Sequence, residues 1–298
     1  MKILLTGANG QVGHSLCRVL PAMATVQATT RDGRLPGHAI ACHALDLGVA
    51  GAVADVVQAI APDVVVNAAA YTAVDKAESD PDLAMRINAD AVAELAQACA
   101  ERDIPLLHYS TDYVFDGTAT QPYRPDDPTA PLGVYGRSKL AGEQAIRNSG
   151  ARHLILRTAW VYGLHGHNFL RTMLRLGAER DELRVVADQI GCPTPARVIA
   201  EVTARILQQG NGDGGTQHLV CDGQTTWHGF AEAIMADAVA AGMLERAPRM
   251  VPIPTSDYPT PAQRPAWSVL DTSDLREAYG IVLPDWRSAL QTTLQRPG

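Results

Sequence analysis

The stretch MKILLTGANGQVG (residues 1–13) decides the fold. It places the apolar run KILL directly before Gly7, Gly10 and Gly13, which follow a GxxGxxG spacing. Glycines at these positions allow a tight turn and let backbone amides approach a pyrophosphate at the N-terminus of the next helix. We therefore expect a strand, a nucleotide-binding loop and a helix, in that order.

Apolar runs alternate with helical stretches through the first half of the chain, which indicates a parallel sheet. We expect strands at residues 2–7, 25–30, 63–70, 105–111 and 153–163. The run DVVVNAAA is apolar on both faces, as a strand covered by helices on both sides would be. The clearest helix runs from about Asp82 to Glu101, after the start signals of SDP. The predicted fold class is α/β, a Rossmann-like doubly wound parallel sheet.

The pattern changes after about residue 160, where proline and glycine become frequent, as in GCPTPA (191–196) and RAPRMVPIPTSDYPTPAQRP (246–265). We expect an NAD(P)-binding Rossmann domain at residues 1–160. Residues 161–298 would form a smaller, mainly substrate-binding region, with some segments returning to the first domain. Ligands of such folds bind beyond the carboxyl ends of the strands.

Composition excludes several function classes. The 298 residues carry a net charge of −7, which argues against a nucleic acid or an anionic membrane surface as partner. The N-terminal apolar run is too short for a signal peptide or a membrane span, so we expect a cytoplasmic protein. The five scattered cysteines never form a CxxC pair, which suggests neither a disulfide framework nor a zinc site.

A second motif lies in YGRSKLAGE (135–143), where Tyr135 and Lys139 are one helical turn apart on the same face. Such a pair also arises by chance, so its meaning depends on the rest of the chain. A free phenol has a pKa near ~10, and a neighbouring ammonium lowers it. With Lys139 close by, Tyr135 would be a useful general acid.

These two motifs occur together with NAAA (67–70) and YSTDYVFDG (109–117), and the combination resembles the extended short-chain dehydrogenase/reductase superfamily. Within it, NAAAYTAVDKAE, STDYVFDG, YGRSKLAGE, DQIGCPTPA and RPAWSVLDT are similar to the dTDP-4-dehydrorhamnose reductase family. The matching segments run from residue 3 to about residue 290.

The resemblance implies NADPH-dependent reduction of the C4 ketone of dTDP-4-dehydro-6-deoxy-L-mannose to dTDP-L-rhamnose. Tyr135 would protonate the ketone oxygen, Thr111 would hydrogen-bond it, and Lys139 would also hold the ribose hydroxyls of the cofactor. Related dehydratases have a glutamate where this chain has Tyr113. Reduction is therefore favoured over dehydration, with Asp112 shaping the site or assisting proton transfer.

The end of the second strand bears on cofactor choice. An NAD-preferring fold usually has an acid here to bind the ribose, whereas this chain has Thr29, Thr30 and Arg31. An arginine can pair with a 2′-phosphate, so we expect NADPH, while Asp32 leaves NADH possible. The full set of expected cofactor contacts, most of them implied by the resemblance, is Gly7, Asn9, Gly10, Gln11, Val12, Arg31, Asp46, Leu47, Ala68, Ala69, Ala70, Tyr71, Tyr135 and Lys139.

The resemblance also implies contacts to a dTDP-sugar substrate. The candidates are Val74, Asp112, Tyr113, Trp160, Asn168, Gln189 and Arg264. The guanidinium of Arg264 suits phosphate oxygens. Trp160 could equally belong to the core.

A metal site is not expected. Some members of the family bridge a dimer through magnesium with acidic residues, where this chain has Ser15 and Arg197. His165 and His167 lack a nearby third ligand and suit a solvated loop better than a metal site. We expect a monomer or a weak homodimer.

Two other functions stay open. One is a related sugar-nucleotide epimerase or dehydratase. The other is a non-catalytic, NADP-binding regulatory subunit that has kept the reductase fold, although the intact Thr111, Tyr135 and Lys139 argue against it.

Overall fold

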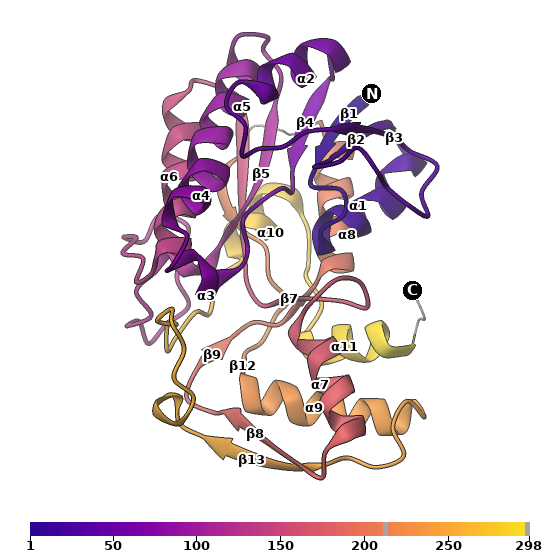
Figure 1. The fold of residues 1–298 in the computed structure, drawn as a ribbon, viewed down its shortest axis with the longest axis vertical. Coiled ribbons are helices and arrows are strands. Elements are labelled where there is room, and N and C mark those ends of the chain that lie inside the picture. Colours follow the sequence, from indigo (N-terminus) through magenta and orange to yellow (C-terminus); the bar gives the residue numbers. More distant parts are fainter. Residues whose placement is uncertain (211–213, 296–298) are drawn as a thin grey trace.

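The computed structural model describes residues 1–210 and 214–295, so residues 211–213 and 296–298 of the expected 161–298 region lie outside the described residues. Its centre is a seven-stranded, all-parallel sheet with the strand order β11-β6-β5-β4-β1-β2-β3 (Figure 1). The strands are β1 (Lys2–Thr6), β2 (Thr25–Thr30), β3 (Ala41–Ala44), β4 (Val64–Asn67), β5 (Leu106–Thr111), β6 (His153–Thr158) and β11 (Gly215–His218). This sheet confirms the predicted Rossmann-like fold class.

Helices cover both faces of the sheet, and the remaining strands form short pairs below it (Figure 1). The helices are α1 (Gln11–Val19), α2 (Ala52–Ile60), α3 (Val74–Ala77), α4 (Pro81–Met85), α5 (Ala91–Ala100), α6 (Val134–Asn148), α7 (Phe169–Glu179), α8 (Ala196–Gln208), α9 (Trp227–Ala240), α10 (Ser273–Tyr279) and α11 (Trp286–Gln295). The short strands are β7 (Val161–Tyr162), β8 (Glu182–Val186), β9 (Ile190–Gly191), β10 (Thr194–Pro195), β12 (Thr225–Thr226) and β13 (Arg249–Ile253).

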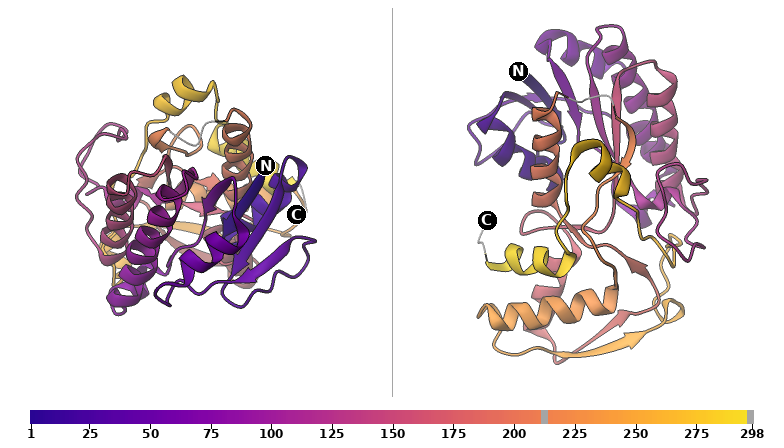
Figure 2. Two further views of the ribbon diagram at one scale, coloured as in Figure 1. Left: turned by 90° about the horizontal axis from the view of Figure 1, so that it is seen from above. Right: turned by 180° about the vertical axis from the view of Figure 1, so that it is seen from behind.

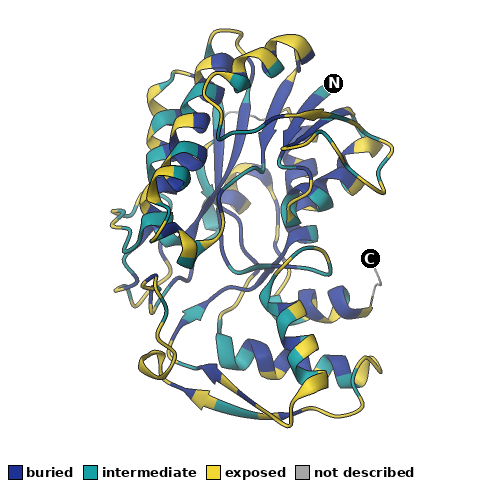
Figure 3. Cartoon of the chain, viewed as in Figure 1, coloured by how far each residue is buried: buried dark blue, intermediate teal, exposed yellow. Residues whose placement is uncertain are grey.

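Alternation along the strands divides the core into two layers. In β1, Ile3 and Leu5 pack into the core under α1 and α8, while Leu4 packs into the core under α2, α5 and α6. Val65 lies on the second side in the same way, between Val64 and Val66 on the first. Side chains of consecutive strand residues point to opposite faces, so a strand buried on both sides must be apolar throughout. Figure 3 shows the central strands buried along their length.

Segments from the second half of the chain return to the sheet. Helix α8 packs against α1 on one face, and β11 pairs with β6 at the edge. The view from behind in Figure 2 shows α8 and α10 lying over that face. The remaining elements, α7, α9, α11 and the pair β8/β13, gather beyond the carboxyl ends of the strands around an apolar cluster that includes Leu170, Phe230 and Leu290.

Two predicted elements differ from the observed ones. The expected strand 153–163 ends at Thr158, because Trp160 has a φ of 45° and turns the chain into β7. The expected helix 82–101 is interrupted by a π-helical turn at Arg86–Asp90 between α4 and α5. In that turn, the side chain of Asn88 bonds to the backbone N–H and C=O of Tyr71. A π-turn of this kind is frequent near functional sites.

None of the helices that the structure describes is long and apolar enough to cross a membrane.

The fingerprint loop depends on close backbone approach. A Cβ at Gly13 would lie 2.1 Å from the carbonyl oxygen of Gly7, and one at Gly7 would lie 2.6 Å from the backbone of Ala69. Gly7 also has a φ of +68°, where a side chain is strained. Hydrogen atoms at these positions let α1 begin directly against the ends of β1 and β4.

Replacing Gly13 tests this constraint. We predict that Gly13→Ala lowers the free energy of unfolding by ~1–3 kcal/mol, because the added methyl group must displace backbone atoms. Urea denaturation measures the change. Gly163→Ala is the matched control, since its nearest new contact would be 4.0 Å away and ordinary. Equal stability of the two variants would contradict the packing described here.

Candidate functional site

The candidate site lies where β5 ends and α6 begins. Thr111 is the last residue of β5, and Asp112 opens the short turn that follows it. Helix α6 starts after Gly133 and presents Tyr135 in its first turn. Gly136 lets the start of α6 pack against the backbone of Tyr113, because a Cβ at Gly136 would lie 2.2 Å from the carbonyl oxygen of Tyr113. The glycine within the tyrosine–lysine motif therefore brings Tyr135 close to the end of β5.

Thr111, Asp112 and Tyr135 form a buried polar cluster. The hydroxyl of Thr111 donates to Asp112 Oδ1 at 3.0 Å, accepts from the N–H of Tyr113 at 3.2 Å and interacts with the Tyr135 hydroxyl. A threonine hydroxyl has only one hydrogen. That hydrogen is directed at Asp112. Burial keeps Tyr135 a protonated phenol at neutral pH, the form required of a general acid.

Burial controls the titration of this cluster. It raises the pKa of Tyr135 to about 12, with the Asp112 carboxylate adding to the effect and Thr111 opposing it. It also raises the pKa of Asp112 to about 6, against hydrogen bonds to Ser268 and Thr111 that lower it. The Tyr135–Lys139 spacing predicts a lowered pKa for Tyr135. In the protein chain alone the shift has the opposite direction.

Lys139 explains the difference. Its Nζ donates to the carbonyl oxygen of Tyr109 at 2.7 Å and lies 3.2 Å from His108 Nε2, so it contacts β5 rather than the Tyr135 hydroxyl. The side chain is 2% exposed. Burial lowers its pKa to about 8, while the charge of Glu143 acts in the other direction. No motif in the sequence points to His108, and only the tertiary structure places it beside Lys139.

A cavity of about 460 Å³ lies beside the fingerprint loop. Its lining includes nine of the expected cofactor contacts: Gly7, Asn9, Gly10, Arg31, Asp46, Leu47, Ala68, Ala69 and Ala70. Because the glycines keep side chains away from this surface, a dinucleotide backbone could approach it closely. The residues present therefore fit the cofactor that the sequence predicts.

The other expected cofactor residues lie around this cavity rather than in its lining. Gln11 lines a second cavity on the far side of the loop. Val12 packs against the core, and Tyr71 is buried beside Tyr135. Since Tyr71 directly follows Ala70, it connects the cavity to the Thr111–Tyr135 cluster.

The two charged residues at the end of β2, Arg31 and Asp32, differ in their hydrogen-bond partners. Arg31 is 74% exposed, and its Nε lies 3.9 Å from Asp46 Oδ1. Asp32 accepts hydrogen bonds at Oδ1 from the hydroxyl of Thr30 and from the N–H of Arg34, both at 3.1 Å. The acid is thus held within its own turn, while the guanidinium stays open toward the cavity.

One group of expected substrate residues gathers near Tyr135. The ring of Tyr113 meets the ring of Tyr135 edge-on at 5.5 Å between centroids. Arg264 lies close enough for its charge to lower the pKa of Tyr113, although burial dominates and raises it. Arg264 is held by Asp75 at 2.8 Å, and Val74 precedes Asp75 at the start of α3. Asp75 belongs to this group and was not predicted.

A second group lies below the sheet. Trp160 stacks on Trp227 with ring centroids 3.5 Å apart, and Trp227 Nε1 donates to Gln189 Oε1 at 3.2 Å. Gln189 also donates to the hydroxyl of Thr255 at 3.0 Å. The structure thus brings the predicted Trp160 and Gln189 together through Trp227, which gave no signal in the sequence.

Asn168 has a different environment from the one expected. It caps α7 by accepting from the N–H of Arg171, and its amide donates to the carbonyl oxygens of Gly163 and His165. Both amide hydrogens are therefore used inside the loop. Only its carbonyl oxygen has remaining capacity for a substrate.

Comparison with known proteins agrees with this geometry. A family model described as the RmlD substrate binding domain matches residues 1–297. A dTDP-4-dehydrorhamnose reductase of Burkholderia thailandensis is 50% identical, with 97% of each chain covered. The corresponding Escherichia coli K12 protein is 43% identical over 99% of this chain and 97% of its own.

The chain belongs to the dTDP-4-dehydrorhamnose reductase family. A solved structure of the Bacillus anthracis reductase, in complex with NADP, has a TM-score of 0.89 and 34% identity and covers 98% of both chains. These findings confirm the resemblance, the fold class and the class of enzyme, an oxidoreductase.

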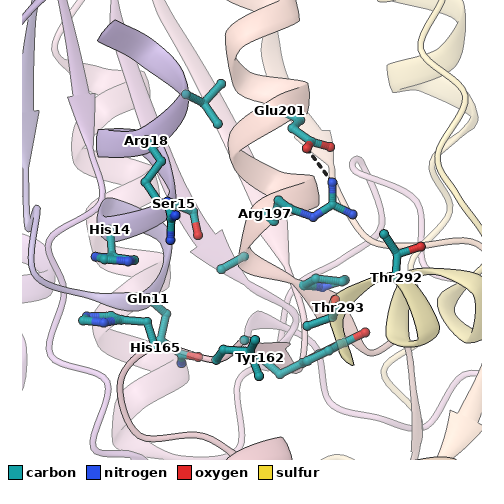
Figure 4. Close-up of a pocket in the computed structure, with 15 residues that line it drawn as sticks. Gln11, His14, Ser15, Arg18, Tyr162, His165, Arg197, Glu201, Thr292 and Thr293 are labelled. Carbon is teal, nitrogen blue, oxygen red and sulfur yellow. Dashed lines mark hydrogen bonds and ion pairs between the residues drawn. The ribbon is translucent and has the colours of Figure 1, made fainter. Parts of the chain in front are cut away.

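The second cavity concerns the residues at which this chain departs from some family members. It has a volume of about 670 Å³ and lies between α1 and α8. Figure 4 shows Ser15 and Arg18 on one side and Arg197 and Glu201 on the other. Arg197 donates to Glu201 at 2.6 Å, so the carboxylate of this cavity is already paired. Within residues 1–210 and 214–295, no group of three His, Cys, Asp or Glu side chains could hold a metal ion.

One of the loop histidines, His165, contacts other histidines, which the sequence does not predict. His165 is exposed but stacks on His14 at 3.8 Å between centroids, and His14 Nδ1 lies 3.1 Å from His38 Nε2. Burial, followed by His165, His38 and Arg18, lowers the pKa of His14 to about 4. The prediction for His165 as simply solvated is therefore incomplete, because the three rings come from separate segments.

The raised pKa of Asp112 predicts a pH-dependent stability effect. Its folded pKa of about 6 lies above the value of 3.8 for a free group, so its contribution is fully present below the unfolded pKa and is lost as pH rises through about 6. We predict that Asp112→Asn raises the free energy of unfolding by up to about 2–3 kcal/mol near neutral pH and has little effect near pH ~4.

Urea denaturation at the two pH values measures this effect. Asp116→Asn is the control, because hydrogen bonds from Thr118 and Tyr123 lower the pKa of Asp116 and reverse the sign. A destabilised Asp112→Asn at neutral pH would contradict the assignment.

Proposed function

We propose that this enzyme reduces the C4 ketone of dTDP-4-dehydro-6-deoxy-L-mannose to dTDP-L-rhamnose with NADPH, and that Tyr135 is the general acid. The supporting observation is the buried Thr111–Asp112–Tyr135 cluster, with Lys139 one turn later, beside the cavity of the fingerprint loop. The names of the relatives supply the substrate class.

The fingerprint residues would hold the cofactor. Backbone amides around Gly7, Asn9 and Gly10 would bind the pyrophosphate at the N-terminus of α1. Asp46 and Leu47 would contact the adenine, and Lys139 the ribose hydroxyls. When bound, NADPH supplies the hydride for the ketone carbon. Arg31 supports NADPH over NADH because its exposed guanidinium can pair with a 2′-phosphate.

Tyr135 would supply the proton. As negative charge develops on the ketone oxygen, the phenol can transfer its hydrogen to that oxygen. Thr111 would then hydrogen-bond the same oxygen. Burial excludes water from this transfer, and the high pKa of Tyr135 keeps it protonated until charge appears.

The substrate would extend from this cluster toward the second region. Arg264 would bind phosphate oxygens, with Asp75 holding its guanidinium in place. Val74, Asp112 and Tyr113 would surround the reacting sugar, and Trp160, Asn168 and Gln189 would complete the site. The division into residues 1–160 and 161–298, a cytoplasmic location and a monomer or weak homodimer are parts of the same proposal.

Removing the phenol hydroxyl tests the acid role. We predict that Tyr135→Phe lowers kcat by ~10²–10⁴-fold, because the ketone oxygen loses its proton donor. NADPH affinity should change little. Steady-state NADPH oxidation with the dTDP-keto sugar, together with a fluorescence titration of NADPH, measures both. Tyr123→Phe, which removes a hydroxyl bonded to Asp116 away from the cluster, is the control.

Turnover that survives in Tyr135→Phe would contradict the acid role. Tight NADPH binding by the wild type without reduction of any keto sugar would favour the regulatory subunit. Formation of an epimerised or dehydrated product would favour the other enzyme classes.

Cofactor preference tests the role of Arg31. We predict that Arg31→Ala weakens NADPH binding by about tenfold or more, the cost of losing a charge-assisted hydrogen bond, and leaves NADH binding nearly unchanged. Arg34→Ala is the matched control, since Arg34 is exposed in the same turn but does not line the cavity. Equal losses in both variants would indicate general charge attraction instead.

A further inference from the structure

A buried chain of hydrogen bonds crosses the carboxyl end of the sheet from β1 to α6. Asn67 Oδ1 accepts from the hydroxyl of Thr6 at 2.5 Å and from the N–H of Ala69 at 3.2 Å. Asn67 Nδ2 lies 2.9 Å from His108 Nδ1, and Lys139 Nζ lies 3.2 Å from His108 Nε2. The side chains of Thr6, Asn67, His108 and Lys139 are all at most 2% exposed. Water therefore cannot replace a missing donor or acceptor, and each of these groups must be paired within the protein.

The orientation of Asn67 fixes the tautomer of His108. The backbone N–H of Ala69 can only donate, so the atom that faces it must be the amide oxygen of Asn67. The amide nitrogen then donates to His108 Nδ1, which must accept. Burial holds the pKa of His108 well below its usual value, so the ring is neutral. A neutral imidazole has one hydrogen, which must lie on Nε2.

This tautomer is unfavourable for a charged Lys139. An ammonium has three donors and no acceptor, so it would face the Nε2–H of His108 donor to donor. A neutral amine can accept that hydrogen and still donate to the carbonyl oxygen of Tyr109. The charged form requires His108 to move its hydrogen to Nδ1, where it would oppose the amide of Asn67.

The other titratable groups around Lys139 do not remove this conflict. On α6, Tyr135 is a protonated phenol, and Glu143 receives hydrogen bonds from Arg157 and Arg147. On β5, Tyr109 has its hydroxyl paired with Thr203. Glu143 favours the ammonium through its charge, but burial has the larger effect on Lys139.

We propose that Asn67 and His108 are positioning residues that favour the neutral amine of Lys139, so that binding of the dinucleotide is coupled to protonation of Lys139. The inference rests on the proposed function in one respect, the transfer of Lys139 to the ribose hydroxyls. At the ribose, the hydroxyl oxygens can accept hydrogen bonds from the ammonium of Lys139. Its Nζ would then no longer face the Nε2–H of His108. The proton comes from solvent.

The variant Asn67→Asp reverses the tautomer with almost no change of shape. One carboxylate oxygen still accepts from Thr6 and Ala69, while the other places an acceptor opposite His108 Nδ1. The ring hydrogen should move to Nδ1, and Nε2 should then accept from the ammonium of Lys139. The ¹⁵N chemical shifts of the His108 ring report the tautomer directly, without cofactor.

NADPH affinity between about pH 7 and about pH 9.5 reports the coupling, above the titration of the 2′-phosphate near ~6. We expect wild-type affinity to fall by up to about tenfold per pH unit once Lys139 loses its proton. In Asn67→Asp this decline should begin at least about one pH unit higher. Lys139→Arg, which stays charged, should remove the decline.

His108→Phe is the second variant, in case Asn67→Asp does not fold. It keeps a buried ring, removes the opposing N–H and should also move the decline upward. His218→Phe is the matched control, because His218 is equally buried but bonds to the carbonyl oxygen of Asp271. Its pH dependence should equal that of the wild type, which a merely structural effect of losing a buried histidine would not predict.

A wild-type His108 with its hydrogen on Nδ1 would overturn the inference, as would the same affinity decline in wild type, Asn67→Asp and His108→Phe. These outcomes are separable from failure of the proposed function. A wild type that binds no NADPH at any pH would refute the function, while the tautomer of the free protein still decides the role of Asn67.

Discussion

The need to pair polar groups in a dry environment constrains the whole carboxyl end of the sheet. Thr6, Asn67 and His108 come from three neighbouring strands and are completely buried, so each must find its partner in the next. An unpaired buried group costs about 1–3 kcal/mol, which fixes the register of these strand ends. Lys139 completes the series and thereby anchors α6. Tyr135, one turn earlier, is placed beside Thr111 as a result.

The fingerprint loop adds a second, steric constraint. Glycine at 13 lets α1 approach the backbone of Gly7, and glycine at 7 lets the loop approach the backbone of Ala69, which is also the residue that orients Asn67. The surface expected to bind the cofactor and the hydrogen-bond network that reaches Lys139 therefore share one backbone N–H. A dinucleotide that binds at this loop would therefore lie next to the hydrogen bonds that connect Asn67, through His108, to Lys139.

Features that depend on local sequence could be predicted. The glycine spacing, the apolar strands and the one-turn separation of Tyr135 and Lys139 each follow from neighbours in the chain, and the sheet has the expected fold. Features that depend on distant residues could not. Arg264 and Asp75 are separated by 189 positions, and Trp160 finds Trp227 only after the chain turns at a positive φ. The contact of Lys139 with His108 likewise requires knowing which strand faces α6.

A crystal structure with NADPH and an unreactive analogue of the keto sugar tests the central claim most directly. The account predicts that the Tyr135 hydroxyl lies ~2.6–3.2 Å from the sugar oxygen at C4. Lys139 Nζ should have moved from the carbonyl oxygen of Tyr109 to the ribose hydroxyls of the cofactor. A closed complex in which the Tyr135 hydroxyl points away from the sugar, or in which Lys139 stays on His108, would contradict it.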